Sequence, residues 1–409
     1  MSKRKVIILL TVLITFTFSG CWSRREINEL AIVAAMGLDK TPDGKIELTV
    51  EIVRPAVLTK GVGSAAKGKS YWIVEATGET VLDTARNLNL KSPRRLFFSH
   101  TQVLVFGERL ARDGLLQVLE RISRSNEVRR NIYVLITPGR AKDIIEAEPD
   151  IENVPGIGLR GLIERLTVTS KGVGVDLKDF LAALSSKSSA PVATKIEIIP
   201  DNRTREIWPG QARGAGTAEG QAGPGTVKSV ELTGTAVFHE DKLVGWLNQE
   251  ESTGLLWVKG NVQRTITVIR EPQEGKIMGI ETTRSASELK PELKGGKVKM
   301  TVKIRQEGDI AEFTGRAKVD TPEKVHRIDD ILAKKIKEQA ERTIKKAQGP
   351  LHADIFGFGE AIRRKYPQKW AEIEPNWQQL FRELEVEVKV QANIRRRNLT
   401  TQPPERSPF

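Results

Sequence analysis

One thiol near the start of the chain is a candidate for covalent chemistry. Cys21 is the only cysteine among 409 residues, and it follows two small residues, the second of which is Gly20. Before them lie a basic block at 3–5 and an apolar run at 6–18, which is the layout of a secretory signal. The pattern predicts that residues 1–20 are a lipoprotein signal peptide, cut between Gly20 and Cys21, and that the Cys21 thiol carries lipid.

The apolar run is too short to be a permanent membrane anchor. It is 13 residues long, whereas a membrane-spanning helix needs about 20. An ordinary secretory signal with an incidental cysteine is the alternative, and Phe18 stands where lipoprotein signals most often carry leucine. The position and uniqueness of Cys21 favour lipidation, by a diacylglyceryl group and fatty acyl chains such as palmitate.

A second stretch has the spacing of a phosphate-binding loop. Gly63, Gly68, Lys69 and Ser70 fit the pattern G-x-x-x-x-G-K-[ST]. That motif needs a helix directly afterwards, whose N-terminal amides point at the phosphates. Residues 71–77 are instead aromatic and β-branched, which predicts a strand. We therefore interpret the match as chance and expect neither a nucleotide nor another cofactor.

The other reactive side chains form no catalytic or metal-binding pattern. His100, His239, His326 and His352 are scattered without metal-ligand spacing. Ser99 precedes His100 in a predicted strand, where neighbouring side chains point to opposite faces and cannot act together. The sequence predicts a protein that is not an enzyme and has no metal site.

Composition indicates a folded protein of two or three domains with apolar cores. The chain is 39% hydrophobic and 29% charged, with a formal net charge of +13. Removal of the three basic residues with the signal lowers this charge to +10. The charge suits an anionic membrane surface. We expect no nucleic-acid partner, because the chain carries an export signal and its basic residues are spread. A single cysteine allows no internal disulfide.

The first half alternates between predicted strands and helices. This mixture predicts an N-terminal α/β domain at 21–208. Alternating residues at 46–52 predict a half-buried strand, which a turn at 42–44 joins to the strand before it as a hairpin. The predicted strands are 31–38, 46–52, 71–77, 97–106, 131–137 and 192–199, and the predicted helices are 79–90, 110–122, 141–147, 159–166 and 177–184.

A composition break divides the chain. Residues 209–226 hold six glycines, two prolines and no large apolar residue, so we expect a flexible linker there. A C-terminal α+β domain is predicted at 227–397, either as one body or with a small strand-rich subdomain at 227–290. A disordered tail is predicted at 398–409.

The C-terminal half begins with predicted strands and ends with predicted helices. The longest helix begins after Asp320-Thr321 and ends at Gly349-Pro350, with an apolar stripe that favours packing against a sheet. The predicted strands are 227–238, 242–247, 262–269, 276–283, 298–304 and 384–390. Helices are predicted around 255–257, from 352 to 366, and on an aromatic face at 370–381. The fold class is multi-domain α+β, with mixed sheets, packed helices and one long amphipathic helix.

Four stretches in order along the chain carry a resemblance to a known family. They are Cys21-Trp22-Ser23-Arg24-Arg25-Glu26-Ile27-Asn28, Gly234-Thr235-Ala236-Val237-Phe238 with Lys242-Leu243-Val244-Gly245, Asp354-Ile355-Phe356-Gly357-Phe358-Gly359 with Tyr366-Pro367 and Trp370, and the last strand running into Ile394-Arg395-Arg396. As a set they resemble the Ger(x)C family, the lipoprotein C subunits of spore germinant receptors. The glycine-rich insert at 210–225 is a departure from the family pattern.

The resemblance implies a function in germination. Members of the family are lipid-anchored, non-enzymatic subunits that work with two integral membrane partners, the A and B subunits. Together they respond to nutrients and start the exit from dormancy. The resemblance also implies a multi-domain α+β body on the outer face of the spore inner membrane.

Two other functions remain open at this stage. A lipid-anchored hydrolase would need a catalytic constellation, which the sequence does not offer. An extracytoplasmic solute-binding lipoprotein of a transporter would be expected to show two doubly wound lobes with a ligand cleft between them. The strand-rich and then helix-rich C-terminal half fits that architecture poorly.

Overall fold

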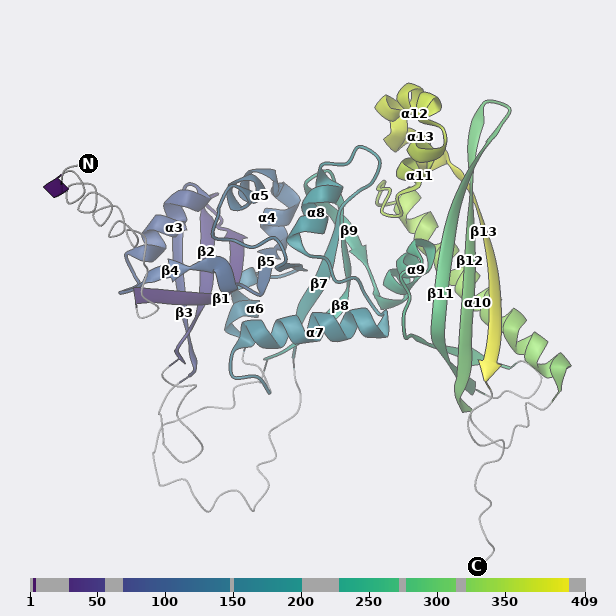
Figure 1. Ribbon diagram of the computed structural model, residues 1–409, viewed down its shortest axis with the longest axis horizontal. Helices are drawn as coiled ribbons and strands as arrows, with labels where there is room; N and C mark the ends of the chain where they lie inside the picture. Colours follow the sequence, from purple (N-terminus) through teal and green to yellow (C-terminus); the bar gives the residue numbers. More distant parts are fainter. Residues whose placement is uncertain are drawn as a thin grey trace, which may run out of the picture.

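The computed structural model describes residues 3–4, 29–55, 69–147, 151–200, 228–271, 277–313 and 321–396. Two β-sheets lie side by side along the length of the molecule, and helices cover them (Figure 1). The predicted α+β class, with mixed sheets and packed helices, is confirmed. The predicted linker and tail, Cys21, and all of the predicted signal peptide except residues 3–4 lie outside the described residues.

The first sheet has nine strands and mixes both directions. Its order is β3-β2-β1-β5-β6-β7-β8-β9, with the short β4 paired to β1. The pairs β1/β4, β1/β5, β5/β6 and β6/β7 are parallel and the others antiparallel, including the predicted β1/β2 hairpin. The strands are β1 (Leu30–Lys40), β2 (Ile46–Val53), β3 (Tyr71–Gly78), β4 (Arg95–Phe97), β5 (Val103–Gly107), β6 (Tyr133–Thr137), β7 (Val192–Pro200), β8 (Lys228–His239) and β9 (Lys242–Leu247).

Helices cover both faces of this sheet (Figure 1). One apolar cluster joins the sheet to Leu88, Leu119 and Phe180 on one face, and another joins it to Ile145 and Ile163 on the other. The central strands are therefore buried on both faces, as in a three-layer sandwich. The helices are α3 (Val81–Asn89), α4 (Glu108–Asp113), α5 (Leu116–Ser123) and α8 (Leu177–Leu184) on the first face, and α6 (Ala141–Glu146) and α7 (Pro155–Thr169) on the second.

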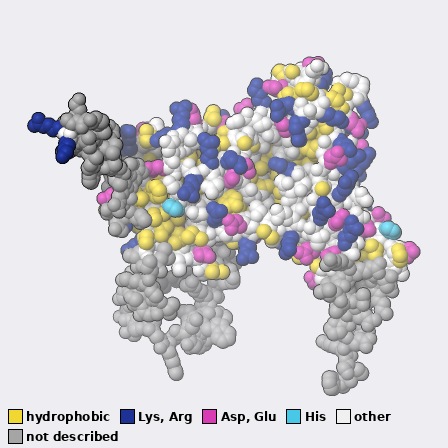
Figure 2. All heavy atoms as spheres, viewed as in Figure 1, with side chains coloured by type: hydrophobic (Ala, Val, Ile, Leu, Met, Phe, Trp, Pro, Cys, Tyr) yellow, Lys and Arg dark blue, Asp and Glu magenta, His cyan; other side chains and the backbone are white. Residues whose placement is uncertain are grey.

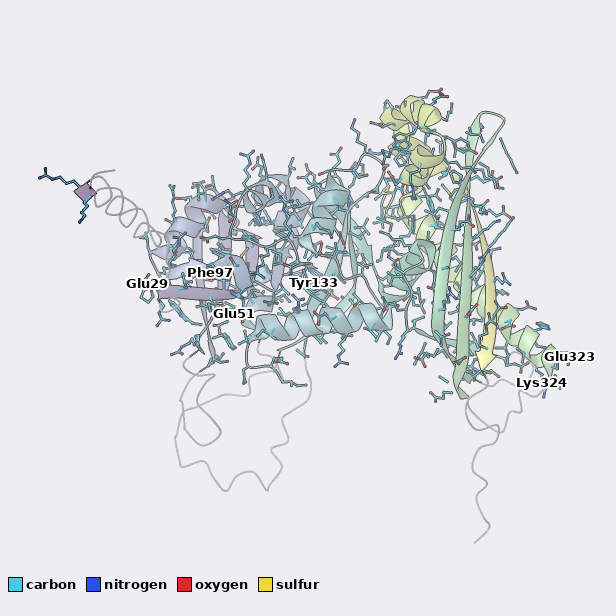
Figure 3. The ribbon with its side chains drawn as sticks, in the orientation of Figure 1. Glu29, Glu51, Phe97, Tyr133, Glu323 and Lys324 are labelled. Atoms are coloured by element: carbon cyan, nitrogen blue, oxygen red, sulfur yellow. The ribbon has the colours of Figure 1, made fainter. Side chains whose placement is uncertain are left out.

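The second layer of helices corrects the prediction for β2. Thr49 and Glu51 belong to the face predicted to be solvated, yet neither side chain is exposed. Glu51 faces the first turn of α7, where the Gly156 N–H donates to its carboxylate at 3.0 Å (Figure 3). A smaller correction concerns α3, because the apolar spacing of Val81, Leu82, Ala85 and Leu88 predicts one buried face, whereas Leu82 is 38% exposed.

Two predicted elements are each broken in two. The predicted strand 97–106 is β4, a 3-10 turn η2 (Phe98–His100) and β5. The turn takes up extra residues, because β4 and β5 both pair parallel with β1 over Leu30–Ile32 and Ala35–Leu38. The predicted helix 110–122 is α4 and α5, which are separated at Gly114, where φ is +130°.

The second sheet is a four-stranded unit with the order β10-β11-β12-β13, antiparallel except for the parallel pair β12/β13. Gly295 and Gly296 form the turn between β11 and β12, with φ of +57° and +78°. The strands are β10 (Ile266–Arg270), β11 (Ile277–Lys294), β12 (Lys297–Phe313) and β13 (Glu385–Arg396). Both β11 and β12 extend far beyond the predicted ranges, into residues whose apolar alternation is weak.

Helices cover one face of the second sheet. The predicted long amphipathic helix is α10. Its apolar stripe is buried from Ile328 to Ile344, whereas Val325, the first residue of the predicted stripe, is half-buried. The predicted helix from 352 begins only at Phe358, because the preceding residues form a turn. The helices are α9 (Gln249–Lys259), α10 (Pro322–Gln348), α11 (Phe358–Lys365), α12 (Pro367–Ile373), η3 (Glu374–Asn376) and α13 (Trp377–Glu383).

The sheets do not divide where the composition changes. Strands β7 and β8, on opposite sides of 209–226, are antiparallel neighbours in the first sheet. The predicted subdomain 227–290 is not a single unit, because β8 and β9 join the first sheet while β10 and β11 join the second. Val192 and Val237 of the first sheet share an apolar cluster with Trp257 and Ile336. The apolar core is thus continuous between the two sheets.

Candidate functional site

Four of the residues singled out by sequence have no described position. Cys21 and Gly20 of the predicted lipidation site, and Gly63 and Gly68 of the phosphate-loop match, lie outside the described ranges. The predicted lipidation and cleavage sites therefore stay predictions.

The end of the phosphate-loop match leads directly into a strand. The Lys69 ammonium lies 5.5 Å from the centre of the Tyr71 ring, and the Ser70 hydroxyl donates to the Asn153 carbonyl. Strand β3 begins at Tyr71, as predicted. The amides of a helix N-terminus, which hold phosphates in such loops, do not follow Ser70.

Ser99 and His100 lie in the turn η2 and not in a strand, which corrects the prediction. The Ser99 hydroxyl donates to the Glu127 carbonyl at 2.8 Å, and the His100 ring packs against Phe97 at 5.7 Å. The serine hydroxyl is thus committed to the backbone. Within the described ranges, no group of three or more histidine, cysteine or acidic residues is arranged to hold a metal ion.

A concave site lies where the two sheets meet. A cleft of about 1310 Å³ is lined by the α7–α8 connection and α8 on one side. The C-terminal end of α9, the middle of β11 and the segment 355–365 line the other side. Clefts of this kind between structural units are common places for ligands.

A buried carboxylate shapes one wall of the cleft. Asp354 accepts N–H donors from Phe356 at 3.2 Å, Gly357 at 3.0 Å, Phe358 at 3.1 Å and Gly359 at 2.8 Å. Burial raises the pKa of Asp354 to about 6, and the four amide donors oppose that rise. The carboxylate fixes the turn that leads into α11.

Close packing around the same turn explains its glycines. Gly357 has φ of +81°, a conformation that favours glycine. A Cβ on Gly359 would approach Trp377 Nε1 within 2.8 Å and the Ser188 carbonyl within 2.7 Å. Trp377 in turn packs edge-on against Trp370 at 5.4 Å. The predicted aromatic face, with Trp370 and Trp377, therefore packs behind the turn that forms the cleft wall.

Lys259 projects from the end of α9 into the cleft. Its side chain remains accessible to solvent although protein surrounds most of it, because it enters a cleft and not the core. Burial lowers its pKa, while the charges of Asp354 and Asp179 raise it. Among the residues that the structure describes, the ammonium has no hydrogen bond or ion pair.

Charges of both signs are interspersed over the face shown in Figure 2. This distribution agrees with the spread of basic residues in the sequence. No helix in the described part of the chain is both long and apolar enough to cross a membrane.

Comparison with known proteins identifies the family. A profile described as "Spore germination protein N-terminal domain" matches residues 23–198. A second, "Spore germination B3/ GerAC like, C-terminal", matches residues 233–398. The chain is a member of the Ger(x)C family. The two profiles together cover both sheets, and the gap between them contains the predicted linker.

Individual relatives match over nearly their whole lengths. Spore germination protein KC of Bacillus subtilis (strain 168) is 27% identical, and the match covers 98% of each chain. Spore germination protein A3 of the same strain is 26% identical, and the match covers 97% of that protein and 96% of this chain. The crystal structure of the GerBC protein shares the fold, with a TM-score of 0.53 at 19% identity. The structural match covers 96% of the GerBC chain and 88% of this chain.

Of the four stretches that carried the Ger(x)C resemblance, residues 21–28 lie outside the described ranges, and two others have a clear role in packing. Gly234-Thr235-Ala236-Val237-Phe238 lies in β8, where a Cβ on Gly234 would approach the Leu247 carbonyl within 2.0 Å. Asp354 to Gly359 is the turn at the cleft wall. These stretches therefore set the packing of the Ger(x)C fold.

Sequence reasoning missed Lys259 and the role of Asp354. A lysine in the last turn of a helix, followed by glycine, is an ordinary helix ending, so Lys259-Gly260 gave no signal. Asp354 before a glycine-containing turn is a recognisable signal, since aspartate side chains often bind the amides that follow them. That signal would have moved the predicted helix start from 352 to 358.

Proposed function

We propose that this chain is the C subunit of a nutrient germinant receptor, a non-enzymatic protein that helps to start spore germination. The observation that carries the proposal is the tandem match of both family profiles, 23–198 and 233–398, in the order of the family. Relatives named as spore germination proteins A3, B3 and KC support it over nearly full length.

Lipid on Cys21 would hold the mature protein on the outer face of the spore inner membrane. The signal-like residues 1–20 and the single cysteine support this part of the proposal. A diacylglyceryl cysteine supplies two chains, and two chains are needed for stable anchoring. There the protein would meet its partners, the integral membrane A and B subunits of the same receptor.

A solute-binding lipoprotein of a transporter is the less favoured function. Such proteins have two doubly wound lobes, whereas the second sheet here is antiparallel except for β13. The matched relatives are also spore germination proteins.

Complementation tests the germination role. Spores of the source organism that lack the gene should lose their response to at least one nutrient, and the intact gene should restore it. Cross-linking in spore membranes should recover the protein with two integral membrane proteins, the proposed A and B subunits. A full nutrient response without the gene, under every nutrient that wild-type spores answer, would contradict the proposal.

Replacement of the anchoring residue tests the membrane attachment. Cys21→Ala should leave the body folded but remove fatty-acid label from the protein in sporulating cells. Germination should weaken because the subunit is no longer held beside its partners. The anchor proposal fails if the wild-type protein takes up no label. It fails too if the processed alanine variant stays in the membrane fraction after a high-salt wash.

A further inference from the structure

The cleft between the two sheets has the size and composition of a small-molecule site. Its volume of about 1310 Å³ exceeds that of most drug-sized pockets, so a small ligand would leave room for water. Apolar side chains such as Val258, Leu289 and Phe356 line it beside charged ones. An occupant therefore needs both an apolar portion and a polar group.

Lys259 is the cation in this cleft that is ready to accept a ligand. Three basic side chains line the cleft. The Arg364 guanidinium lies 3.9 Å from Glu360, and the Lys365 ammonium donates to the Pro291 carbonyl at 2.8 Å. Within the described part of the chain, the Lys259 ammonium has no such partner.

The backbone next to Lys259 packs closely against β11. Gly260 caps α9 with φ of +71°, and a Cβ there would approach the Ser287 N within 2.8 Å. The Ser287 hydroxyl is buried at the cleft wall and has no hydrogen-bond partner among the described residues. The Ser287 hydroxyl could thus serve as a donor beside the Lys259 ammonium if the serine side chain rotates.

The surrounding acids restrict the charge of a ligand. Asp179, Glu288 and Glu360 line the same cleft and would repel a dianion such as phosphate. A single lysine is a point charge that one carboxylate can satisfy, whereas phosphate sites usually combine several donors.

We propose that this cleft binds a small molecule with one carboxylate group and an apolar portion, and that the Lys259 ammonium is the partner of the carboxylate. The site goes beyond the germination role and does not depend on it. Because its walls come from both sheets, an occupant would contact both parts of the molecule at once.

Binding should take up protons at alkaline pH. A carboxylate beside Lys259 favours the charged ammonium, whose pKa burial lowers in the empty cleft. Affinity should therefore fall as the pH rises through the pKa of the ammonium in the empty protein. The charged groups that face it are Asp179 on α8, Glu288 on β11, Asp354, and Glu360, Arg364 and Lys365 on α11.

Competitive acetylation of lysines tests the site in the full-length protein in a non-ionic detergent. Mass spectrometry would compare acetylation of Lys259 with that of the exposed Lys171, with hexanoate present or absent. Hexanoate should slow acetylation of Lys259 about tenfold, as a charge-assisted contact implies, and leave Lys171 unchanged. Hexanamide, which has the same shape without the charge, should give little protection.

Variants separate the charge of Lys259 from its packing. Lys259→Met should weaken hexanoate binding about tenfold in calorimetry, since it removes the ammonium and keeps the aliphatic stem. Lys259→Arg should retain most of the affinity, and the control Lys171→Met should behave as wild type. Equal protection by hexanamide, or hexanoate affinity unchanged in Lys259→Met, would overturn the proposal. Protection by phosphate or by an acidic partner protein, without any by hexanoate, would also overturn it.

Discussion

Glu51 is a carboxyl group that the fold removes from water. It lies on β2 beneath the first turn of α7, and its one hydrogen-bond donor among the described residues is the Gly156 amide. Burial raises the pKa of Glu51 to about 8. The folded state therefore holds a proton over a pH range in which the unfolded chain has released it.

This difference predicts how stability depends on pH. Between the unfolded value of 4.5 and about 8, the folded protein binds more protons, so the free energy of unfolding falls as the pH rises. The slope from Glu51 is at most about 1.4 kcal/mol per pH unit. Glu51→Gln should remove this slope, and urea unfolding at a series of pH values measures it. The exposed control Glu79→Gln should follow the wild-type curve, and parallel curves for wild type and Glu51→Gln would contradict the prediction.

Asp354 gives a second prediction at the residue scale. Asp354→Asn keeps one carbonyl oxygen for three of the amides but turns an NH₂ group toward the fourth, Gly359. Asp354→Ala leaves all four without a partner. Because an unsatisfied buried donor costs about 1–3 kcal/mol, the alanine variant should lose the most stability and the asparagine variant less. Chemical unfolding measures the order, with the exposed Asp330→Asn as control. An alanine variant as stable as wild type would show that the amides do not depend on the carboxylate.

Single residues of the cleft were the hardest features to predict from sequence. Lys259 is one of many basic residues, and its significance comes only from the segments 285–291 and 355–365, which the fold brings opposite it. The phosphate-loop match shows the reverse case. Its four residues have the right spacing, and only the strand after Ser70 indicates that the pattern lacks its helix.

At the scale of elements, the break between α4 and α5 depends on one glycine. Gly114 has φ of +130°, and a Cβ there would approach Asp241 Oδ2 within 2.6 Å. The same break places the Leu116 amide 3.0 Å from that oxygen. The turn between β8 and β9 thus docks on the interrupted helix.

Paired glycine substitutions test this docking. Gly114→Ala should destabilise the protein by at least about 1–2 kcal/mol, from the backbone conformation alone. Gly161→Ala, in the middle of α7 where nothing lies within 4 Å of the new Cβ, should instead stabilise by about 0.5–1 kcal/mol. Thermal and urea unfolding of both variants decide the matter. The prediction fails if both substitutions shift stability in the same direction.

Most elements could be predicted because their apolar periodicity is strong. The stripe of α10 and the alternation in the first residues of β11 and of β12 are examples. The errors arose where tertiary contacts decide. The apolar residues at both ends of 97–106 favour a strand, but the two ends pair with separate parts of β1, and η2 lies between them. Burial of Glu51 depends on α7, which lies about a hundred residues further along the chain and donates the Gly156 amide.

At the scale of the whole molecule, the sequence composition predicts a domain boundary at 209–226, but the first sheet continues across it. Residues 201–227 separate β7 from β8, and neither family profile includes any of this stretch. The two strands nevertheless pair from Val192–Val237 to Pro200–Lys228. Composition indicates that ordering a glycine-rich segment costs conformational entropy. It does not indicate that the two ends of the segment lie side by side in the fold.

The direct pairing of Pro200 with Lys228 leads to a prediction about the whole chain. The 27 residues from 201 to 227 join the ends of neighbouring antiparallel strands, so a two-residue Asn-Gly turn has the geometry to replace them. The shortened chain should fold, and by loop-closure entropy its free energy of unfolding should rise by up to about 2 kcal/mol. A variant with 201–227 replaced by a Gly/Ser sequence of equal length should unfold as wild type does. Urea unfolding of the three proteins tests the idea. A fall in the unfolding free energy of the shortened chain, while the Gly/Ser variant stays unchanged, would mean that the strands need a long connection to reach this register.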